Sequence, residues 1–250
     1  MICIRFKTFE CQGIENGRIK EYLKASALAA KHITDRPVLG GCIGPFSLAG
    51  RLFDMTEIMT SAIIEPETIN LLLEKCTAFI SMYALEMKSC GINGIIIAEP
   101  AAGLLDESMC EDFSSRFVKQ IVDVLQDENF MVILHNCGNT GHLTQSMINT
   151  GARGLHFGNK IDMIQTLKEV PNNILVMGNL DPVEVFRMSN PHQIRSFTKD
   201  LLVSTKEYSN FVISSGCDTP PGVATENIAA FFETIADYNR NLTTIKSLTN

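Results

Sequence analysis

The stretch FMVILHNCG (130–138) joins an unbroken apolar run to a histidine and a cysteine at its end. The apolar residues do not alternate with polar ones, which is typical of a strand covered on both faces, as in a parallel sheet. Five further runs of this kind lie at 37–44, 94–98, 153–158, 173–179 and 210–216. The sequence therefore predicts a parallel sheet of six strands.

Helical patterns separate these runs. In the clearest, from Pro66 to Cys90, apolar residues recur every three or four positions, and Gly91 suits a stop. Other helices are predicted at 18–33, 111–127, 140–150, 160–170, 191–207 and 223–240. Strands that alternate with helices indicate right-handed βα units, and no linker or repeat interrupts them. We therefore predict a single α/β domain over residues 1–250.

The position of the polar residues favours a barrel over an open doubly wound sheet. The segment GGCIGPFSLAG (40–50) has glycines but neither of the phosphate-binding glycine motifs. Polar residues instead follow several strands, as at the active face of a TIM barrel. They are Glu99, His135, Cys137, Asn179, Asp181, Cys217 and Asp218. We predict a TIM (β/α)8-type barrel that is incomplete, because only six strands are found.

Composition excludes some classes of partner. The 250 residues carry a net charge of −7 without a run of Lys or Arg, which argues against nucleic acid or an anionic membrane as main partner. No stretch approaches the ~18 apolar residues of a membrane span. The start MICIRFKTFECQ does not resemble a signal peptide, so a cytoplasmic location is predicted. The eight cysteines are then expected to be free, buried or metal-bound.

His135 and Cys137 are candidate metal ligands. Side chains two apart in an extended segment point to the same side, so both can reach one ion, and Gly138 lets the chain turn nearby. Zinc accepts imidazole and thiolate together, and a catalytic zinc typically has three protein ligands. Cys217 follows the last predicted strand and is the candidate third ligand. The alternative is a core strand that ends by chance in polar residues.

The residues also resemble a known family. H-x-C-G after a strand, followed by S-x-G-C-x-x-P-P-G-x-x-x-E-N-I, is similar to the zinc-dependent methylcobamide:coenzyme M methyltransferases of the uroporphyrinogen decarboxylase superfamily. Supporting segments are GCIGPFSLAG (41–50), AEPAAGLL (98–105) and MGNLDP (177–182), and the similarity covers about residues 18–240.

This resemblance implies a TIM barrel in which His135, Cys137 and Cys217 bind zinc. The zinc would hold a small thiol such as coenzyme M as the thiolate, which attacks the methyl group of a methylated corrinoid carried on a partner protein. Such chemistry belongs to one-carbon metabolism of the methanogenic type. The nearest alternative is the decarboxylase itself, which needs no metal and uses an arginine-rich N-terminal segment that we do not find here.

Residues 18–50 match the part of that family's sequence that comes after its first two strand–helix units. The sequence therefore predicts that the opening quarter of the barrel is missing and that the edges of strands 37–44 and 210–216 are exposed, where another chain could pair. Three explanations stay open: a truncated and non-catalytic homologue, a subunit completed by a partner, or a homo-oligomer.

Other rim residues are assigned roles with an alternative beside each. Glu99 is predicted to be catalytic, as a displaceable fourth zinc ligand or a proton acceptor, or else to form a salt bridge or to cap the following loop. Asn179 and Asp218 are predicted to bind substrate. Alternatively, Asn179 and Asp181 shape the turn after their strand. Asp218 could instead cap a loop or form a hydrogen bond that orients the His135 imidazole. His156 is interpreted as an interior histidine.

Overall fold

A computed structural model describes residues 13–138 and 140–248. The start MICIRFKTFECQ, and with it the prediction about a signal peptide, lies outside the described residues. The chain forms two compact units: one runs up to Gly138 and includes His142–Leu155, and the other contains His156 onward together with the turn before His142. The two units are described separately, and the single domain predicted for the chain stays a prediction.

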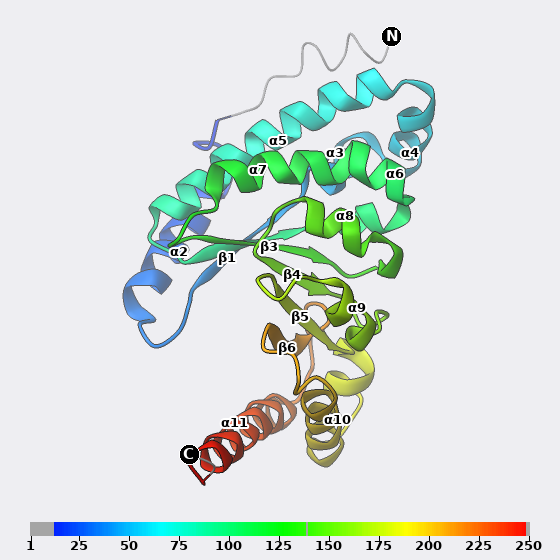
Figure 1. Cartoon of the computed structure of the whole chain (residues 1–250). Coiled ribbons are helices and arrows are strands. Elements are labelled where there is room, and N and C mark those ends of the chain that lie inside the picture. Colours follow the sequence, from blue (N-terminus) through cyan, green and yellow to red (C-terminus); the bar gives the residue numbers. More distant parts are fainter. Residues whose placement is uncertain (1–12, 139, 249–250) are drawn as a thin grey trace. The chain divides into compact units, whose positions relative to one another are not determined.

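The elements of the first unit alternate between strands and helices (Figure 1). They are α2 (Ile19–His32), β1 (Leu39–Ile43), α3 (Pro45–Phe53), α4 (Met55–Ile64), α5 (Pro66–Ser89), β2 (Gly94–Ala98), η1 (Pro100–Leu104), α6 (Glu107–Cys110), η2 (Glu111–Ser115), α7 (Arg116–Leu125), β3 (Met131–Asn136), η3 (Gly141–Leu143) and α8 (Thr144–Asn149). Helices α5 and α7 pack side by side.

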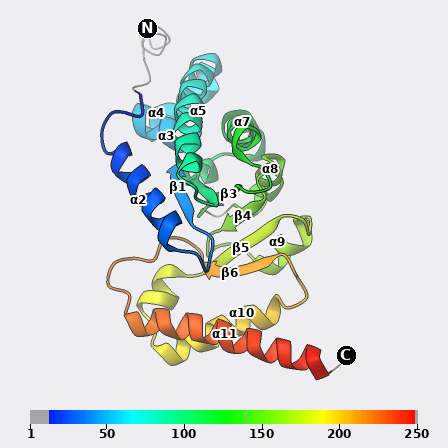
Figure 2. The ribbon, with the colours of Figure 1, turned by 90° about the vertical axis from the view of Figure 1, so that its left-hand side faces the viewer.

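The chain continues through β4 (Gly154–Phe157), α9 (Met163–Glu169), β5 (Leu175–Leu180), η4 (Pro182–Arg187), α10 (Pro191–Ser204), β6 (Phe211–Ser215) and α11 (Thr225–Leu248). Helices α10 and α11 run alongside each other in Figure 2. No helix in the described part of the chain is long and apolar enough to cross a membrane.

The six strands form one parallel sheet in the order β1-β2-β3-β4-β5-β6, which does not close. Each strand lies within two residues of its predicted position, so the sheet and the incomplete barrel are confirmed. Register is regular: Ala98 of β2 pairs with Ile43 of β1 on one side and with His135 of β3 on the other. The ends of β1, β2 and β3 therefore lie side by side.

Helices α3 and α4 were not predicted. They fill the segment between residues 44 and 66, where no helix was expected. Pro45 occupies the first turn of α3, and the Asp54 carboxylate accepts hydrogen bonds from Thr56 N and Glu57 N at the start of α4. Both are ordinary helix-start signals that the sequence carries.

Each unit has its own apolar core. In the first unit α3, α5 and α7 bury Phe46, Ile69 and Phe117, which are among the residues with the lowest exposure. In the second unit the Phe186 and Phe231 rings pack edge to face at a centroid distance of 5.2 Å, next to Ile194. Edge-to-face contacts of this kind add about 0.5–1.5 kcal/mol beyond the area they bury.

Candidate functional site

His135 and Cys137 lie together at the end of β3. His135 is buried at 8% exposure, Cys137 is half-buried and forms no disulfide, and a His135 ring nitrogen lies within 4.8 Å of Cys137 Sγ. At a tetrahedral zinc, bonds of about 2.1 Å to nitrogen and 2.3 Å to sulfur put the two ligand atoms about 3.6 Å apart. The pair can therefore bind one zinc after a side-chain movement of about 1 Å.

The backbone around this pair is fixed from both sides. Asn136 is buried and its Oδ1 accepts a hydrogen bond from Gly138 N at 3.0 Å, which closes a local turn directly after the strand. Glu99 N donates to the His135 carbonyl at 2.8 Å from the neighbouring strand β2. The residues on either side of Cys137 are thus held by hydrogen bonds of their own.

Glu99 is buried at 1% exposure, and its carboxylate faces the start of α3. Phe46 N and Ser47 N donate to its two oxygens at 2.7 and 2.9 Å, and Ser114 Oγ donates at 3.4 Å. Burial raises the pKa of Glu99 to about 6, although the hydrogen bonds to the carboxylate lower it. The N-cap residue Gly44 has no side chain, and a Cβ there would lie 2.5 Å from the Glu99 carboxyl carbon.

Glu99 therefore caps α3 in place of the missing Gly44 side chain. The alternative raised from the sequence was a cap to the loop that follows Glu99, and the structure shows a cap at the start of α3 instead. The catalytic role predicted for Glu99 stays a prediction.

Cys217 lies in the second unit, directly after β6, and is also a half-buried free thiol. Ser215 Oγ donates to the Cys217 carbonyl at 2.7 Å, and Gly216 N donates to Leu180 O at 2.7 Å. A Cβ on Gly216 would lie 2.6 Å from Asn159 N, so only glycine fits there. The segment that carries Cys217 is thus closely packed against its own unit.

Asn179 and Asp181 lie at the end of β5, where the Asn179 amide holds the segment after β4 and the Asp181 carboxylate shapes the turn after β5. Asn179 Nδ2 donates to Gly158 O at 3.0 Å and to Ile161 O at 2.7 Å. Asp181 Oδ1 accepts from Val183 N and Glu184 N, both at 2.8 Å, and so caps η4. The Asp181 contacts match the turn-shaping alternative, whereas Asn179 bonds to the segment after β4 and not to the turn after its own strand. A substrate contact by Asn179 stays a prediction, as does one by Asp218, which is exposed.

One further polar residue lies close to a candidate ligand, although it was predicted only to be an interior histidine. His156, in β4, places Nε2 at 2.9 Å from both Ser214 Oγ and Ser215 O, next to the segment that carries Cys217. The sequence showed only a histidine between Leu155 and Phe157 in an apolar strand. No local signal could have identified its partners, because they lie 58 and 59 residues further along the chain.

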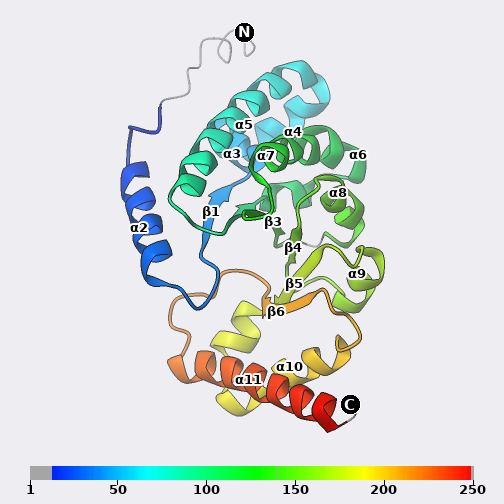
Figure 3. The same cartoon turned by 60° about the vertical axis from the view of Figure 1, so that its left-hand side comes forward.

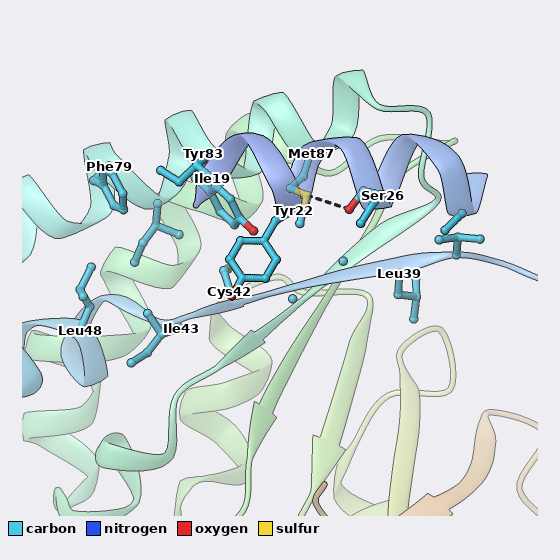
Figure 4. A pocket seen from close by; sticks show the side chains of 16 residues that line it. Ile19, Tyr22, Ser26, Leu39, Cys42, Ile43, Leu48, Phe79, Tyr83 and Met87 are labelled. Carbon is cyan, nitrogen blue, oxygen red and sulfur yellow. Dashed lines mark hydrogen bonds between the residues drawn. The ribbon is translucent and has the colours of Figure 1, made fainter. Parts of the chain in front are cut away.

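A hollow of about 570 Å³ lies between α2, β1 and α5, away from the predicted site residues. Helix α2 runs along the outer side of β1 (Figure 3), and Figure 4 shows Tyr22 of α2 pointing toward β1 beside Cys42. Ser26 Oγ donates to Met87 Sδ at 3.3 Å across the top of this hollow. The lining is mostly apolar, and we assign it no ligand.

Cys42 is expected to react slowly although it lines this hollow. Burial, with the Glu99 charge adding to it, raises the pKa of the Cys42 thiol to about 12. The thiolate fraction at pH 8 is then minute, and the greater nucleophilicity of a high-pKa thiolate offsets only part of this loss. Alkylation by iodoacetamide at pH 8, followed by peptide mass spectrometry, should be about 100-fold slower than for N-acetylcysteine.

The pH dependence provides the check on this prediction. A raised pKa means that the Cys42 rate keeps rising about tenfold per pH unit above pH 9, where the reference thiol has levelled off. A rate that matches the reference, or one that levels off with it, would show that the Cys42 thiol ionises normally.

The known proteins that this chain is similar to include methyltransferases and decarboxylases. Residues 6–238 match the family described as Uroporphyrinogen decarboxylase (URO-D). The methylcobamide:CoM methyltransferase MtbA of Methanosarcina acetivorans is 28% identical over 237 residues, which are 90% of this chain and 66% of that protein. A uroporphyrinogen decarboxylase of Legionella pneumophila is 29% identical over 80% of this chain and 58% of its own length.

A solved structure shares the fold. A methyltransferase from Methanosarcina mazei superposes with a TM-score of 0.82 at 23% identity, over 90% of this chain and 66% of that one. The chain thus spans about two thirds of the length of the methyltransferases that it matches and less of the decarboxylase. Because the family match covers most of the sequence, the chain belongs to the uroporphyrinogen decarboxylase family.

Proposed function

We propose that this chain is a zinc-dependent methyltransferase that moves a methyl group from a protein-bound methylated corrinoid to a small thiol such as coenzyme M. The observation that carries the proposal is the imidazole nitrogen and thiol sulfur held within 4.8 Å at the end of β3. The similarity to proteins named methylcobamide:CoM methyltransferases supports the reaction class.

His135, Cys137 and Cys217 would hold the zinc. A set of one nitrogen and two sulfur ligands suits zinc and leaves a fourth position for the acceptor thiol. A free thiol with a pKa of about 8.5 is mostly protonated at neutral pH, whereas bound zinc keeps a coordinated thiol as the thiolate. Both ligand segments follow strands of one parallel sheet, and functional residues of barrel enzymes gather at that edge.

The chain's own residues would keep the ligands in place. The backbone bond from Glu99 N to His135 O holds the end of β3, and the Asn136 turn presents Cys137. On the other segment, Ser215 and Gly216 fix the backbone that leads into Cys217. Ligands held this way lose little conformational entropy when an ion binds. The corrinoid-protein partner and the cytoplasmic location belong to the same proposal.

A metal-free decarboxylase is the second candidate, and the similarity to the Legionella enzyme favours it. It predicts no stoichiometric zinc and no effect of Cys217→Ser on turnover. A non-catalytic homologue that serves as a partner subunit predicts zinc binding without turnover.

Two measurements on the untagged full chain separate these candidates. The first is zinc per chain by elemental analysis, and the second is methyl transfer from methylcobalamin to coenzyme M, followed by the absorbance change of the corrinoid. We expect close to one zinc and zinc-dependent transfer. No zinc in a folded protein would contradict the proposal, and one zinc without transfer would favour the non-catalytic homologue.

A further inference from the structure

His156 makes a defined hydrogen bond to the strand that leads into Cys217. Its Nε2 lies 2.9 Å from the Ser215 carbonyl oxygen, and since a carbonyl can only accept, Nε2 carries the proton. Ser214 Oγ, also 2.9 Å from Nε2, donates to the same carbonyl at 3.0 Å. One peptide group is therefore fixed by two donors, and the imidazole tautomer at Nε2 is set by the bond.

The bond reaches over a strand. In the sheet order β5 lies between β4 and β6, and strands two apart in a flat sheet are separated by about 10 Å. His156 of β4 thus spans β5 on one face to contact the end of β6. Among the described residues β6 pairs only with β5, so this side chain supplies a second support for an edge strand.

The support is passed on to Cys217 through three consecutive residues. His156 holds the Ser215 carbonyl, Ser215 Oγ donates to the Cys217 carbonyl, and between them Gly216 N donates to Leu180 O. Gly216 also packs too closely on Asn159 for any side chain. With the backbone fixed on both sides of Gly216, the direction of the Cys217 Cα–Cβ bond is set, and the thiol keeps only its side-chain rotamers.

We propose that His156 is a positioning residue that aims the Cys217 thiol at the metal. This inference rests on the proposed function, because it takes Cys217 as a ligand. Outer-shell partners of metal ligands typically change metal affinity by about 10–100-fold when they are removed. His156 would act one step further out, through the backbone, and we expect a loss of about tenfold.

The test compares three variants of the full chain. His156→Leu removes the hydrogen-bond donor and puts an apolar side chain at this half-buried position. His156→Gln puts an N–H at about the position of Nε2. His192→Leu is the matched control, since His192 is exposed in the first turn of α10. Each variant is titrated with cobalt(II), whose thiolate charge-transfer absorption reports the sulfur ligands, and its zinc affinity is measured by chelator competition.

We expect His156→Leu to lose part of the charge-transfer intensity, because the Cys217 thiolate is held less firmly at the metal, and about tenfold in zinc affinity. His156→Gln and His192→Leu should keep both. Equal intensity and affinity in all three variants would overturn the inference. A lower melting temperature of His156→Leu with unchanged cobalt spectra would also overturn it, since that is a purely structural role.

A metal-free measurement separates failure of this inference from failure of the proposed function. If the unmodified chain binds no cobalt through two thiolates, the proposed function fails. The alkylation rate of Cys217 in metal-free protein then shows whether His156 controls the position of the Cys217 thiol. We expect His156→Leu to change this rate several-fold and His156→Gln to leave it unaltered, whereas equal rates would show that His156 does not control the Cys217 thiol.

Discussion

Replacement of Cys137 or Cys217 by serine is expected to abolish tight zinc binding, with a loss of affinity above about 100-fold for either variant. Loss of an outer-shell partner alone costs 10–100-fold, and these variants remove a ligand itself. Serine cannot substitute because its hydroxyl stays protonated and binds zinc far less well than a thiolate. The measurement is zinc per folded chain, followed by competition with a chelator of known affinity.

The controls come from cysteines elsewhere in the same chain. Cys76 is buried in the core of the first unit, and the Cys90 thiol donates only to the Leu23 and Glu86 carbonyls, at 3.4 and 3.3 Å. Cys76→Ser and Cys90→Ser should therefore retain zinc. Equal zinc content in all four variants would refute the assignment of the ligands, whichever reaction the protein catalyses.

The strands β2, β3 and β4 were predictable from the sequence because burial on both faces leaves little room for polar residues in the strand. A strand such as GIIIA (94–98) has no room for polar residues, and β2 is correspondingly buried along most of its length. The pairing of His135 with Cys137 was also predictable, since it follows from alternation within one strand. Local periodicity was sufficient in both cases.

The features that the sequence could not decide depend on contacts between distant segments. The Glu99 carboxylate accepts from Phe46 N, 53 residues earlier, and nothing near Glu99 in the sequence indicates that the α3 N-terminus lacks a capping side chain. The Asn179 amide likewise donates to carbonyls 21 and 18 residues earlier. A polar residue after a strand therefore indicates position at the rim, but whether it faces a substrate or a backbone is set by tertiary packing.

Replacement of Glu99 by alanine is expected to lower the free energy of unfolding by about 3 kcal/mol or more. The substitution leaves Phe46 N and Ser47 N without an acceptor inside the core, and each buried unsatisfied donor costs about 1–3 kcal/mol. It also removes negative charge from the N-terminus of α3, where the helix dipole favours it. Urea unfolding followed by circular dichroism measures the change as a lower midpoint at constant slope.

Ser114→Ala is the matched control, because it removes only the longest of the three bonds to the carboxylate, at 3.4 Å, and should cost less than about 1 kcal/mol. Zinc per folded chain then separates capping from a direct role at the metal. The bond from residue 99 to the His135 carbonyl comes from the backbone N–H, which alanine keeps. Capping alone thus predicts a less stable protein that retains its zinc. Parallel loss of zinc would instead favour Glu99 as a fourth ligand, and an unchanged midpoint would contradict the capping role.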